Sequence, residues 1–279
     1  MWGRFRTFLL FVSFVVLMSV VGWVSAGFWG TSPLGSLLIF AILAGGLNLV
    51  FYFFSDKLVL KSYGAQIVTP RDAPRLHRII DKVVLQAGIP KPRVALIPSA
   101  NPNAFATGRG PKHAVVAATE GIMQLLDDEE LEGVLAHEIS HVKNRDTLVM
   151  TIAATMAAVI SFAARMMVFG RDRDVNPIVA IAVLITAPIA AILLQLAISR
   201  SREFKADQTG ARLVGKPWAL ASALEKLEYG AQVRPIGRGS PATSSLFIVN
   251  PFRSGVMASM FSTHPATHER VRRLRQMRF

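Results

Sequence analysis

The chain has 279 residues, of which 52% are hydrophobic and 18% are charged, and its mean hydropathy is +0.41. Soluble domains carry about 25% charged residues, so this composition excludes a disordered chain and disfavours an ordinary soluble enzyme. The absence of cysteine excludes disulfides, cysteine-ligated zinc, iron–sulfur clusters and thiol nucleophiles. The net charge of +13 indicates either nucleic acid or a membrane surface as a partner, and the location of the basic residues decides between them.

Two N-terminal stretches predict a hairpin of membrane-spanning helices. Phe8–Phe28 and Leu34–Phe54 contain no charged residue, and each is long enough to cross the ~30 Å hydrocarbon core at ~1.5 Å per residue. Arg4 and Arg6 ahead of the first stretch resemble the start of a cleavable signal peptide. An apolar run of about twenty residues exceeds the roughly 7–15 of a signal peptide, however, and predicts an uncleaved anchor.

Two further stretches predict a second hairpin. Thr147–Phe169 holds a single charge, Arg165, near its end, and Pro177–Ser199 holds none, although Pro188 predicts a kink. Both stretches are rich in alanine, which is only weakly apolar. A buried helical hairpin of a soluble domain is therefore the alternative to a second pair of spans.

The distribution of basic residues predicts the orientation in the membrane. Two Lys and Arg residues precede the first stretch, twelve lie in Ser55–Asp146 and fourteen follow from Arg200 onward, which makes 28 of the 31. The turns on the opposite side hold only Arg171 and Arg173, each offset by a neighbouring aspartate. The positive-inside rule then places both termini and Ser55–Asp146 in the cytoplasm. Because topology explains the basic excess, we expect no nucleic-acid partner.

The segment between the hairpins predicts a helix, a small sheet and a second helix. Helical spacing of apolar residues begins at Pro74 and stops at Gly88. Turn residues then separate three short apolar runs, which predict a small antiparallel sheet: Val94–Ile97, Ala104–Thr107 and His113–Ala118. Asp127 or Asp128 caps the next helix, which runs to about Asn144 with acidic residues in its first turn.

The C-terminal segment predicts three helices and a long loop. The helices are expected from Arg200 to about Gly215, across Trp218–Tyr229 and from Pro265, with the loop over Gly230–Ser262. The last helix is basic on one side and carries Val271, Leu274 and Met277 on the other. We interpret its arginines as packing at anionic lipid, with a solvated charged face as the alternative: Arg270, Arg272, Arg273, Arg275 and Arg278.

His137-Glu138-Ile139-Ser140-His141 matches the H-E-x-x-H pattern on a predicted helix. Residues four apart lie on one helix face, so both imidazoles can reach one ion at about 2.0–2.1 Å. The carboxylate of Glu138 lies beside them, where it can take a proton from a water that zinc activates. Two unrelated histidines on a surface helix are the alternative, which the apolar residues Leu131, Val134 and Leu135 disfavour.

A catalytic zinc needs a third protein ligand, and Glu203 is the candidate. Glu203 and Asp207 are four apart on one helix face. We assign Glu203 to the ion and Asp207 to a hydrogen bond that orients a ligand histidine. The alternative is that both are solvated carboxylates paired with nearby basic residues. Topology favours the metal, because His141 lies six residues before the third stretch and Glu203 four residues after the fourth, so a hairpin brings both to one membrane surface.

Together these residues resemble the HtpX family of bacterial membrane zinc metalloproteases, which are relatives of the CAAX prenyl proteases. The resemblance extends over nearly the whole chain and includes Asn101–Gly108, His137–His141, Glu203–Asp207 and Ser262–Pro265. It implies a zincin-like (gluzincin) endopeptidase of the inner membrane that cleaves misfolded or damaged membrane proteins under envelope stress. It also implies one Zn²⁺ per chain, held by His137, His141 and Glu203, with Glu138 as the acid and base.

Two further segments have candidate roles. An edge strand formed by Asn103, Ala104, Phe105, Ala106 and Thr107 would bind substrate by strand addition, or it is a plain sheet strand. His264 would stabilise the oxyanion or approach the metal as a removable ligand, or it only precedes a helix, because Pro265 suits the first helical position. Pro265 also disfavours helical geometry at His264, so His264 and His268 are a poor metal pair.

We therefore predict a mainly α membrane protein with four transmembrane helices and a cytoplasmic α+β protease domain that contains a small sheet. Its parts are hairpins at 1–54 and 147–199 and protease parts at 55–146 and 200–279. We expect a multi-pass endopeptidase with both termini and the active site in the cytoplasm, acting on polypeptides and on membrane proteins in particular. The alternatives are a prenyl-type processing protease and a non-enzymatic membrane scaffold with a structural zinc.

Overall fold

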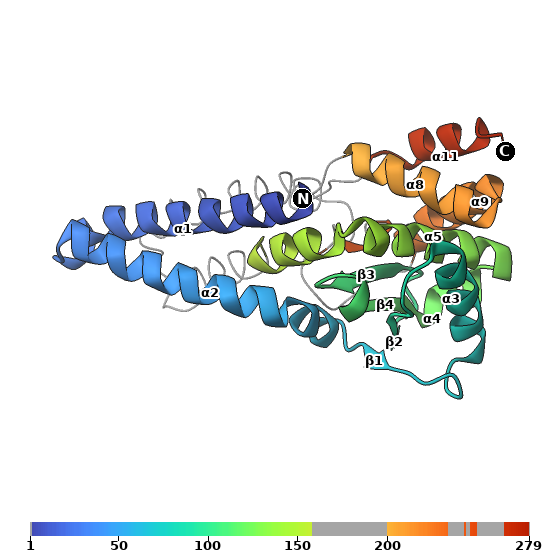
Figure 1. Ribbon diagram of the computed structural model, residues 1–279, viewed down its shortest axis with the longest axis horizontal. Coiled ribbons are helices and arrows are strands. Elements are labelled where there is room, and N and C mark those ends of the chain that lie inside the picture. The colour runs from blue at the N-terminus through green and yellow to red at the C-terminus, as the bar shows by residue number, and fades with distance from the viewer. Residues whose placement is uncertain (1, 158–199, 234–242, 244–245, 250–264, 279) are drawn as a thin grey trace.

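The fold is mainly helical with one small mixed sheet. The computed structural model describes residues 2–157, 200–233, 243, 246–249 and 265–278. Figure 1 shows a long hairpin of α1 (Trp2–Trp29) and α2 (Pro33–Ser62) projecting from a body that contains the sheet and the shorter helices. The predicted helical fold with a small sheet is confirmed.

Helix α2 carries the chain from the hairpin into the body of the protein. It continues to Ser62, beyond Phe54, where the apolar stretch ends in the sequence. Its last turns bury Val59 and Leu60, and the buried carboxylate of Asp56 lies 3.5 Å from the guanidinium of Arg93. The helix is therefore longer than the apolar stretch because its final turns have packing partners.

The described residues contain one helix that is long and apolar enough to cross a membrane, which is α2. The shorter apolar segments are Thr7–Trp23 within α1 and the buried helix Thr147–Ala157. The remainder of the third predicted span and all of the fourth lie outside the described residues.

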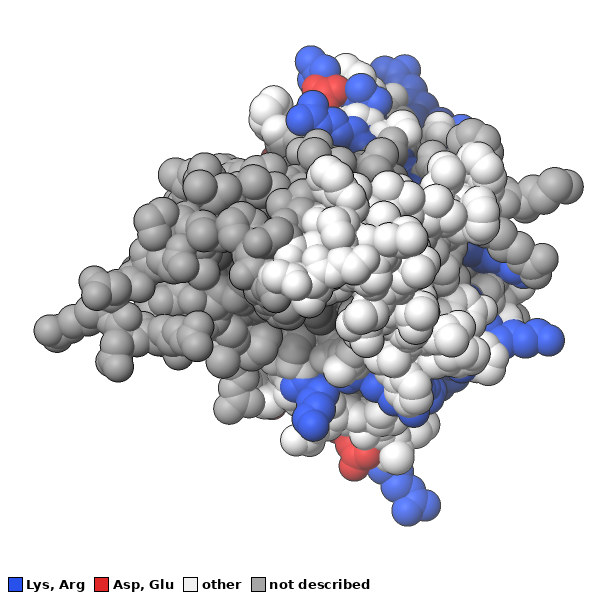
Figure 2. All heavy atoms as spheres, turned by 90° about the vertical axis from the view of Figure 1, so that its left-hand side faces the viewer, with Lys and Arg blue, Asp and Glu red and all other residues white. Residues whose placement is uncertain are grey.

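The hairpin exposes large apolar side chains to its surroundings. Ile42 near its tip is 74% exposed, and the other exposed apolar residues of α2 extend along its length: Leu34, Leu38, Ile39, Leu43, Leu49, Val50, Phe53, Phe54 and Leu58. Figure 2 shows that the described surface at the tip lacks charged residues and that Lys and Arg lie around its margin. An exposed apolar surface of this extent needs an apolar environment or partner.

The sheet has four strands in the order β1 (Gln66–Ile67), β2 (Arg93–Ile97), β4 (Ala114–Thr119) and β3 (Ala104–Gly108). Strands β3 and β4 are antiparallel neighbours, and β1 is antiparallel to β2. The prediction of an antiparallel sheet is wrong for its centre, where β2 and β4 are parallel. The reason is that the chain crosses the end of the sheet after β2, makes β3 at the far edge and returns as β4 between them.

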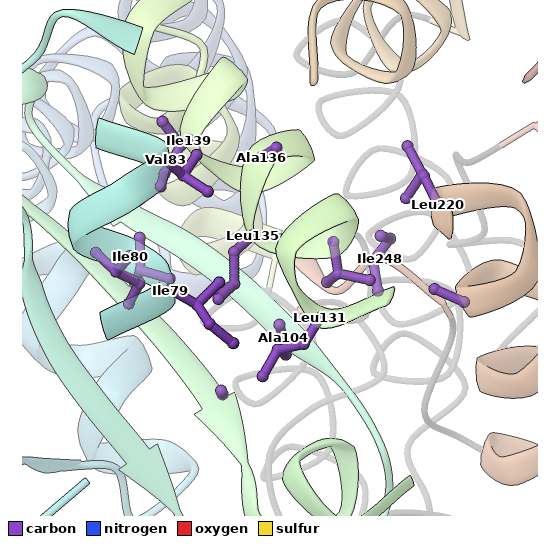
Figure 3. Close-up of a cluster of buried hydrophobic side chains, with 14 of the residues drawn as sticks. Ile79, Ile80, Val83, Ala104, Leu131, Leu135, Ala136, Ile139, Leu220 and Ile248 are labelled. Atoms are coloured by element: carbon purple, nitrogen blue, oxygen red, sulfur yellow. The ribbon is translucent and has the colours of Figure 1, made fainter. Parts of the chain in front are cut away.

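Helices α3 (Pro74–Ala87) and α5 (Asp128–Asn144) cover one face of the sheet. Figure 3 shows their apolar side chains packed together over the strands, with Ala104 of β3 and Leu220 at the same cluster. The other face is buried by the hairpin and by helix Thr147–Ala157, which share one apolar core with Phe105, Val115 and Ala117. The apolar helices and the sheet are thus a single packed unit.

Further α-helices of the described residues are α4 (Glu120–Leu125), α8 (Arg200–Val214), α9 (Pro217–Val233) and α11 (Thr267–Arg275). The helices α8, α9 and α11 lie together beside α5, as Figure 1 shows. Helix α9 continues into the segment predicted as a loop from Gly230. Of the rest of that loop, Leu246–Val249 lie against β3, where the Ile248 N–H donates to the Ala104 carbonyl at 3.3 Å.

Candidate active site

Helix α5 carries the H-E-x-x-H residues, and local sequence determines where it begins and ends. Asp127 caps it as predicted, with a capping box in which Asp127 and Glu130 each accept a hydrogen bond from the other's backbone N–H. The helix ends at Asn144, and the φ of 60° at the following residue, Arg145, is the left-handed conformation typical of a C-terminal cap. Since α5 lies between the sheet and α8, the side chains of its last turns are buried.

His137, His141 and Glu203 form a buried group of three candidate metal ligands. The two histidine Nε2 atoms are 3.3 Å apart, His141 Nε2 is 3.4 Å from Glu203 Oε1, and His137 Nε2 is 3.6 Å from Glu203 Oε2. A tetrahedral ion with bonds of about 2.0–2.1 Å separates its ligand atoms by about 3.3–3.4 Å. The spacing and the donor types therefore fit one divalent ion.

Close packing of α8 on α5 delivers Glu203 to the histidines. Gly210 of α8 meets the backbone of α5, and a Cβ at this position would lie 2.8 Å from the backbone nitrogen of His137. Only glycine permits this approach without a shift of one helix. The convergence of the two segments that the sequence predicts is therefore present.

Asp207 holds the outer nitrogen of His137. Its Oδ1 lies 2.8 Å from His137 Nδ1, and both side chains are buried. A ligand histidine usually donates its second ring N–H in this way, which directs the other nitrogen at the metal. The position matches the role that the sequence analysis assigns to Asp207.

Arg270 of α11 completes this arrangement, and the sequence analysis misplaced it. Its guanidinium donates to Asp207 through Nε at 2.9 Å and Nη2 at 2.7 Å, and through Nη1 to the Ile248 carbonyl at 3.1 Å. Nη2 is also 3.4 Å from His137 Nδ1, but both atoms bear hydrogens, so Asp207 is the acceptor for both groups. The interpretation of Arg270 as an outward residue is wrong, because Arg270, Val271 and Leu274 lie on the buried face of α11. The four-residue spacing of Arg270 and Leu274 was the available signal.

The buried charges set the protonation states of the site. Burial alone would lower the pKa of His137, but hydrogen bonds to Asp207 and Glu203 outweigh it and raise that pKa to about 9. Burial would raise the pKa of Asp207, but Arg270 and His137 lower it to about 2. Burial disfavours the charged form of Arg270, but the Asp207 carboxylate favours it. The pKa of Arg270 is raised as a result. In the absence of metal, a cationic ring and a cationic guanidinium thus share one carboxylate at neutral pH.

Glu138 connects the ligand helix to the edge of the sheet. Its Oε2 accepts a hydrogen bond from the Ala106 N–H of β3 at 2.9 Å. Strand β3 is an edge strand, as predicted, and its residues from Asn103 to Gly108 are buried. The outward carbonyls at its two ends already accept hydrogen bonds, Ala104 from the Ile248 N–H and Gly108 from the Thr147 hydroxyl at 3.1 Å. Pairing of an added strand with β3 would therefore centre on Ala106.

Of the two other histidines with a predicted role, only His268 can be placed relative to this group. His264 lies outside the described residues. His268 is exposed on α11, away from the buried ligands.

A buried His, His and Glu set on two helices, with a helix carboxylate that is hydrogen-bonded to a sheet edge, defines a metallopeptidase site. The chain belongs to peptidase family M48, whose family model matches residues 70–278. The protein is thus a metalloprotease that acts on polypeptides.

Individual relatives agree with this family. The Protease HtpX homolog of Pyrococcus furiosus is 52% identical over 280 residues, covering 98% of this chain and 95% of its own. That of Ralstonia pickettii is 48% identical over 284 residues, covering 99% and 97%. The crystal structure of S. mikatae Ste24p is similar over 97% of this chain with 16% identity and a TM-score of 0.47, and the chain spans 65% of it.

We predict that Arg270→Leu destabilises the protein by about 3–5 kcal/mol, because it removes one partner of a buried ion pair and leaves the Asp207 carboxylate with the His137 ring alone. Chemical unfolding of the purified protein in detergent would measure the change. Arg272→Leu on the exposed side of the same helix is the matched control and should change the unfolding midpoint little. Equal effects of the two substitutions would show that the buried pair has no special role.

We predict that metal binding is proton-linked through His137. A metal ion binds the neutral imidazole, so below a pKa of about 9 it must displace a proton from this ring. The apparent affinity for zinc should rise about tenfold per pH unit for this proton as pH increases toward 9, and level off above it. Calorimetry in two buffers of different ionisation heat would count the released protons. Asp207→Asn removes the main group that raises the pKa of His137. In this variant the zinc affinity should therefore level off at a lower pH than in the wild type. An affinity that does not depend on pH between 6.5 and 9 would contradict this assignment.

Proposed function

We propose that the protein is a membrane-integrated zinc endopeptidase in which His137, His141 and Glu203 hold one Zn²⁺. The observation that carries this proposal is the 3.3–3.6 Å spacing of three buried donor side chains on α5 and α8. Two imidazoles and one carboxylate are a set typical of catalytic zinc, which keeps a fourth position open for water or substrate. A structural zinc would be closed by four protein ligands, so the three-ligand set among the described residues disfavours a scaffold.

Glu138 has the position of the general base and acid. The metal, when bound, supplies Lewis-acid activation of water and of the scissile carbonyl at neutral pH. The Glu138 carboxylate would accept the proton of the attacking water at Oε1 or Oε2 and return it to the leaving amine. Before substrate binds, its hydrogen bond from the Ala106 N–H holds it at the strand edge, beside the place where the scissile peptide would lie. Asp207 and Arg270 keep the ring of His137 directed at the ion.

We infer that substrate binds as an extended segment beside Ala106. Main-chain pairing with an edge strand gives affinity with little selection of sequence, which suits damaged or misfolded polypeptides in envelope quality control. The occupied carbonyls of Ala104 and Gly108 limit this pairing to a few residues. A substrate segment that pairs with the Ala106 N–H would also take that hydrogen bond from Glu138 and leave its carboxylate to the attacking water.

We further infer that the substrates are segments close to a membrane surface. Arg109, directly after β3, lies over the Phe53 and Tyr52 rings of α2, 5.2 and 6.0 Å from their centroids. Aromatic residues followed by lysines, here Lys57 and Lys61, mark the boundary of a membrane span. The end of β3 is therefore beside the boundary segment of α2, which supports cleavage a few residues from the bilayer.

The membrane arrangement follows from the same reasoning. We propose two transmembrane hairpins at 1–54 and 147–199 and cytoplasmic protease parts at 55–146 and 200–279, in the inner membrane. The support is the apolar exposure of the hairpin, the positive-inside distribution of Lys and Arg, and the apolar core that the sheet shares with α1 and α2. Helix α11 packs on α8 and α9, and its contact with anionic lipid stays a prediction.

Substitution of Glu138 by Gln tests the mechanism. We expect at least a hundredfold loss of casein cleavage, because the proton transfer is removed, while one zinc per chain stays bound. In contrast, Glu203→Gln should lose zinc, because the third anionic ligand is removed. Metal analysis and proteolysis of both variants, beside the wild type, would measure this. Casein cleavage by Glu138→Gln at the wild-type rate would refute the mechanism.

Membrane-anchored reporters test the substrate class. An unfolded segment tethered to a membrane span should be cleaved at least about tenfold faster than the same free segment, since anchoring raises its effective concentration at the site. Spacers that move the segment away from the bilayer should reduce this gain, and a segment on the side opposite the predicted cytoplasmic face should stay intact. Equal rates at every spacer length would contradict a juxtamembrane preference.

A further inference from the structure

The outer nitrogen of the second ligand histidine, His141, has a carboxylate beside it. Nδ1 of His141 is buried and makes no hydrogen bond to any residue of the described ranges. The nearest carboxylate belongs to Asp146, whose Oδ2 lies 3.5 Å away. His137 already has such a partner in Asp207, at 2.8 Å.

The end of α5 places Asp146 beside His141. Arg145 adopts the left-handed conformation, which turns the chain back at the C-terminus of the helix. The backbone N–H of Asp146 then donates to the carbonyl of His141 at 2.9 Å, and the Met150 N–H donates to the carbonyl of Asp146 at 3.1 Å. Asp146 is thus held by main-chain hydrogen bonds on both sides.

Arg202 holds the Asp146 side chain from the other ligand helix. Its Nη1 lies 3.2 Å from Asp146 Oδ1, and both side chains are largely buried, at 11% and 17% exposure. Arg202 immediately precedes Glu203, so this ion pair joins the end of α5 to the part of α8 that carries the third ligand. The arrangement repeats the one at His137, where Asp207 lies between the ring and Arg270.

We propose that Asp146 is a positioning residue of the metal site. It accepts the Nδ1 hydrogen of His141 and so directs Nε2 at the ion, while Arg202 keeps the carboxylate in place and links it to Glu203. A shift of about half an ångström would bring the 3.5 Å separation into hydrogen-bond range. This inference rests on the proposed function, because it concerns the same metal.

The test is the affinity of the full-length protein in detergent for zinc, measured by competition with a chelator, and the visible spectrum of the cobalt-substituted protein. Asp146→Ala should weaken zinc binding about 10–100-fold, as loss of such a partner does elsewhere, and should shift the cobalt bands. Asp146→Asn keeps an acceptor oxygen and should recover part of the loss. Asp56→Ala is the matched control, because it removes an acidic partner of similar burial from Arg93, far along the chain from the ligands, and should leave both readouts unchanged.

A charge reversal separates positioning from general stability. The double variant D146R/R202D restores an ion pair between α5 and α8 but leaves His141 without an acceptor. It should fold and still bind zinc about 10–100-fold more weakly. It also serves if Asp146→Ala fails to fold.

Three outcomes would overturn the inference. The first is an Asp146→Ala variant with the zinc affinity and cobalt spectrum of the wild type. The second is a D146R/R202D variant with these wild-type properties. The third is an equal loss of zinc affinity in Asp146→Ala and in Asp56→Ala. In each case the proposed function would stand if the wild type binds one zinc and Glu203→Gln does not. A wild type that binds no zinc would refute the proposed function itself.

Discussion

The close contact between α5 and α8 is the interaction on which the metal site depends. The two ligand-bearing segments are far apart in the chain, and neither alone supplies three donors. Gly210 lets the two backbones approach until Glu203 reaches the histidine pair. The three ligand side chains are then brought together by the packing of two helices. Their relative positions therefore depend on the rigidity of this helix packing.

The burial of this contact requires that every charge in it has a partner. The Glu203 carboxylate lies beside both ligand imidazoles. Asp207 lies between the His137 ring and Arg270. Asp146 lies between the His141 ring and Arg202. An unpaired buried charge would destabilise the folded protein by several kcal/mol. Removal of one residue of such a pair leaves its partner as an unpaired charge of this kind. The same network raises the pKa of His137, so metal and protons compete for the ring. Structural pairing and metal chemistry are here one set of interactions.

The edge strand β3 connects the site to the hairpin of α1 and α2. One face of β3 packs with α5 and the other with the core shared by α1, α2 and helix Thr147–Ala157. The same strand provides the N–H that holds Glu138 and continues into Arg109 over the aromatic rings of α2. Under the proposed function, this continuity would hold the site at a fixed distance from the bilayer.

Short-range patterns are sufficient for much of this molecule. The apolar periodicity and caps predict α3 and α5 closely, four-residue spacing predicts the two imidazoles on one face, and the hairpin topology predicts where Glu203 must return. The parallel pairing of β2 with β4, the passage of Leu246–Val249 along β3 and the carboxylate partner of Arg270 were not predictable in this way. Each depends on which surface packs against which, and that is decided by long-range contacts whose energies no local window contains. In the sequence, Arg270 has the character of a surface residue. Its burial becomes favourable only because the fold places Asp207, sixty-three positions earlier in the chain, beside it.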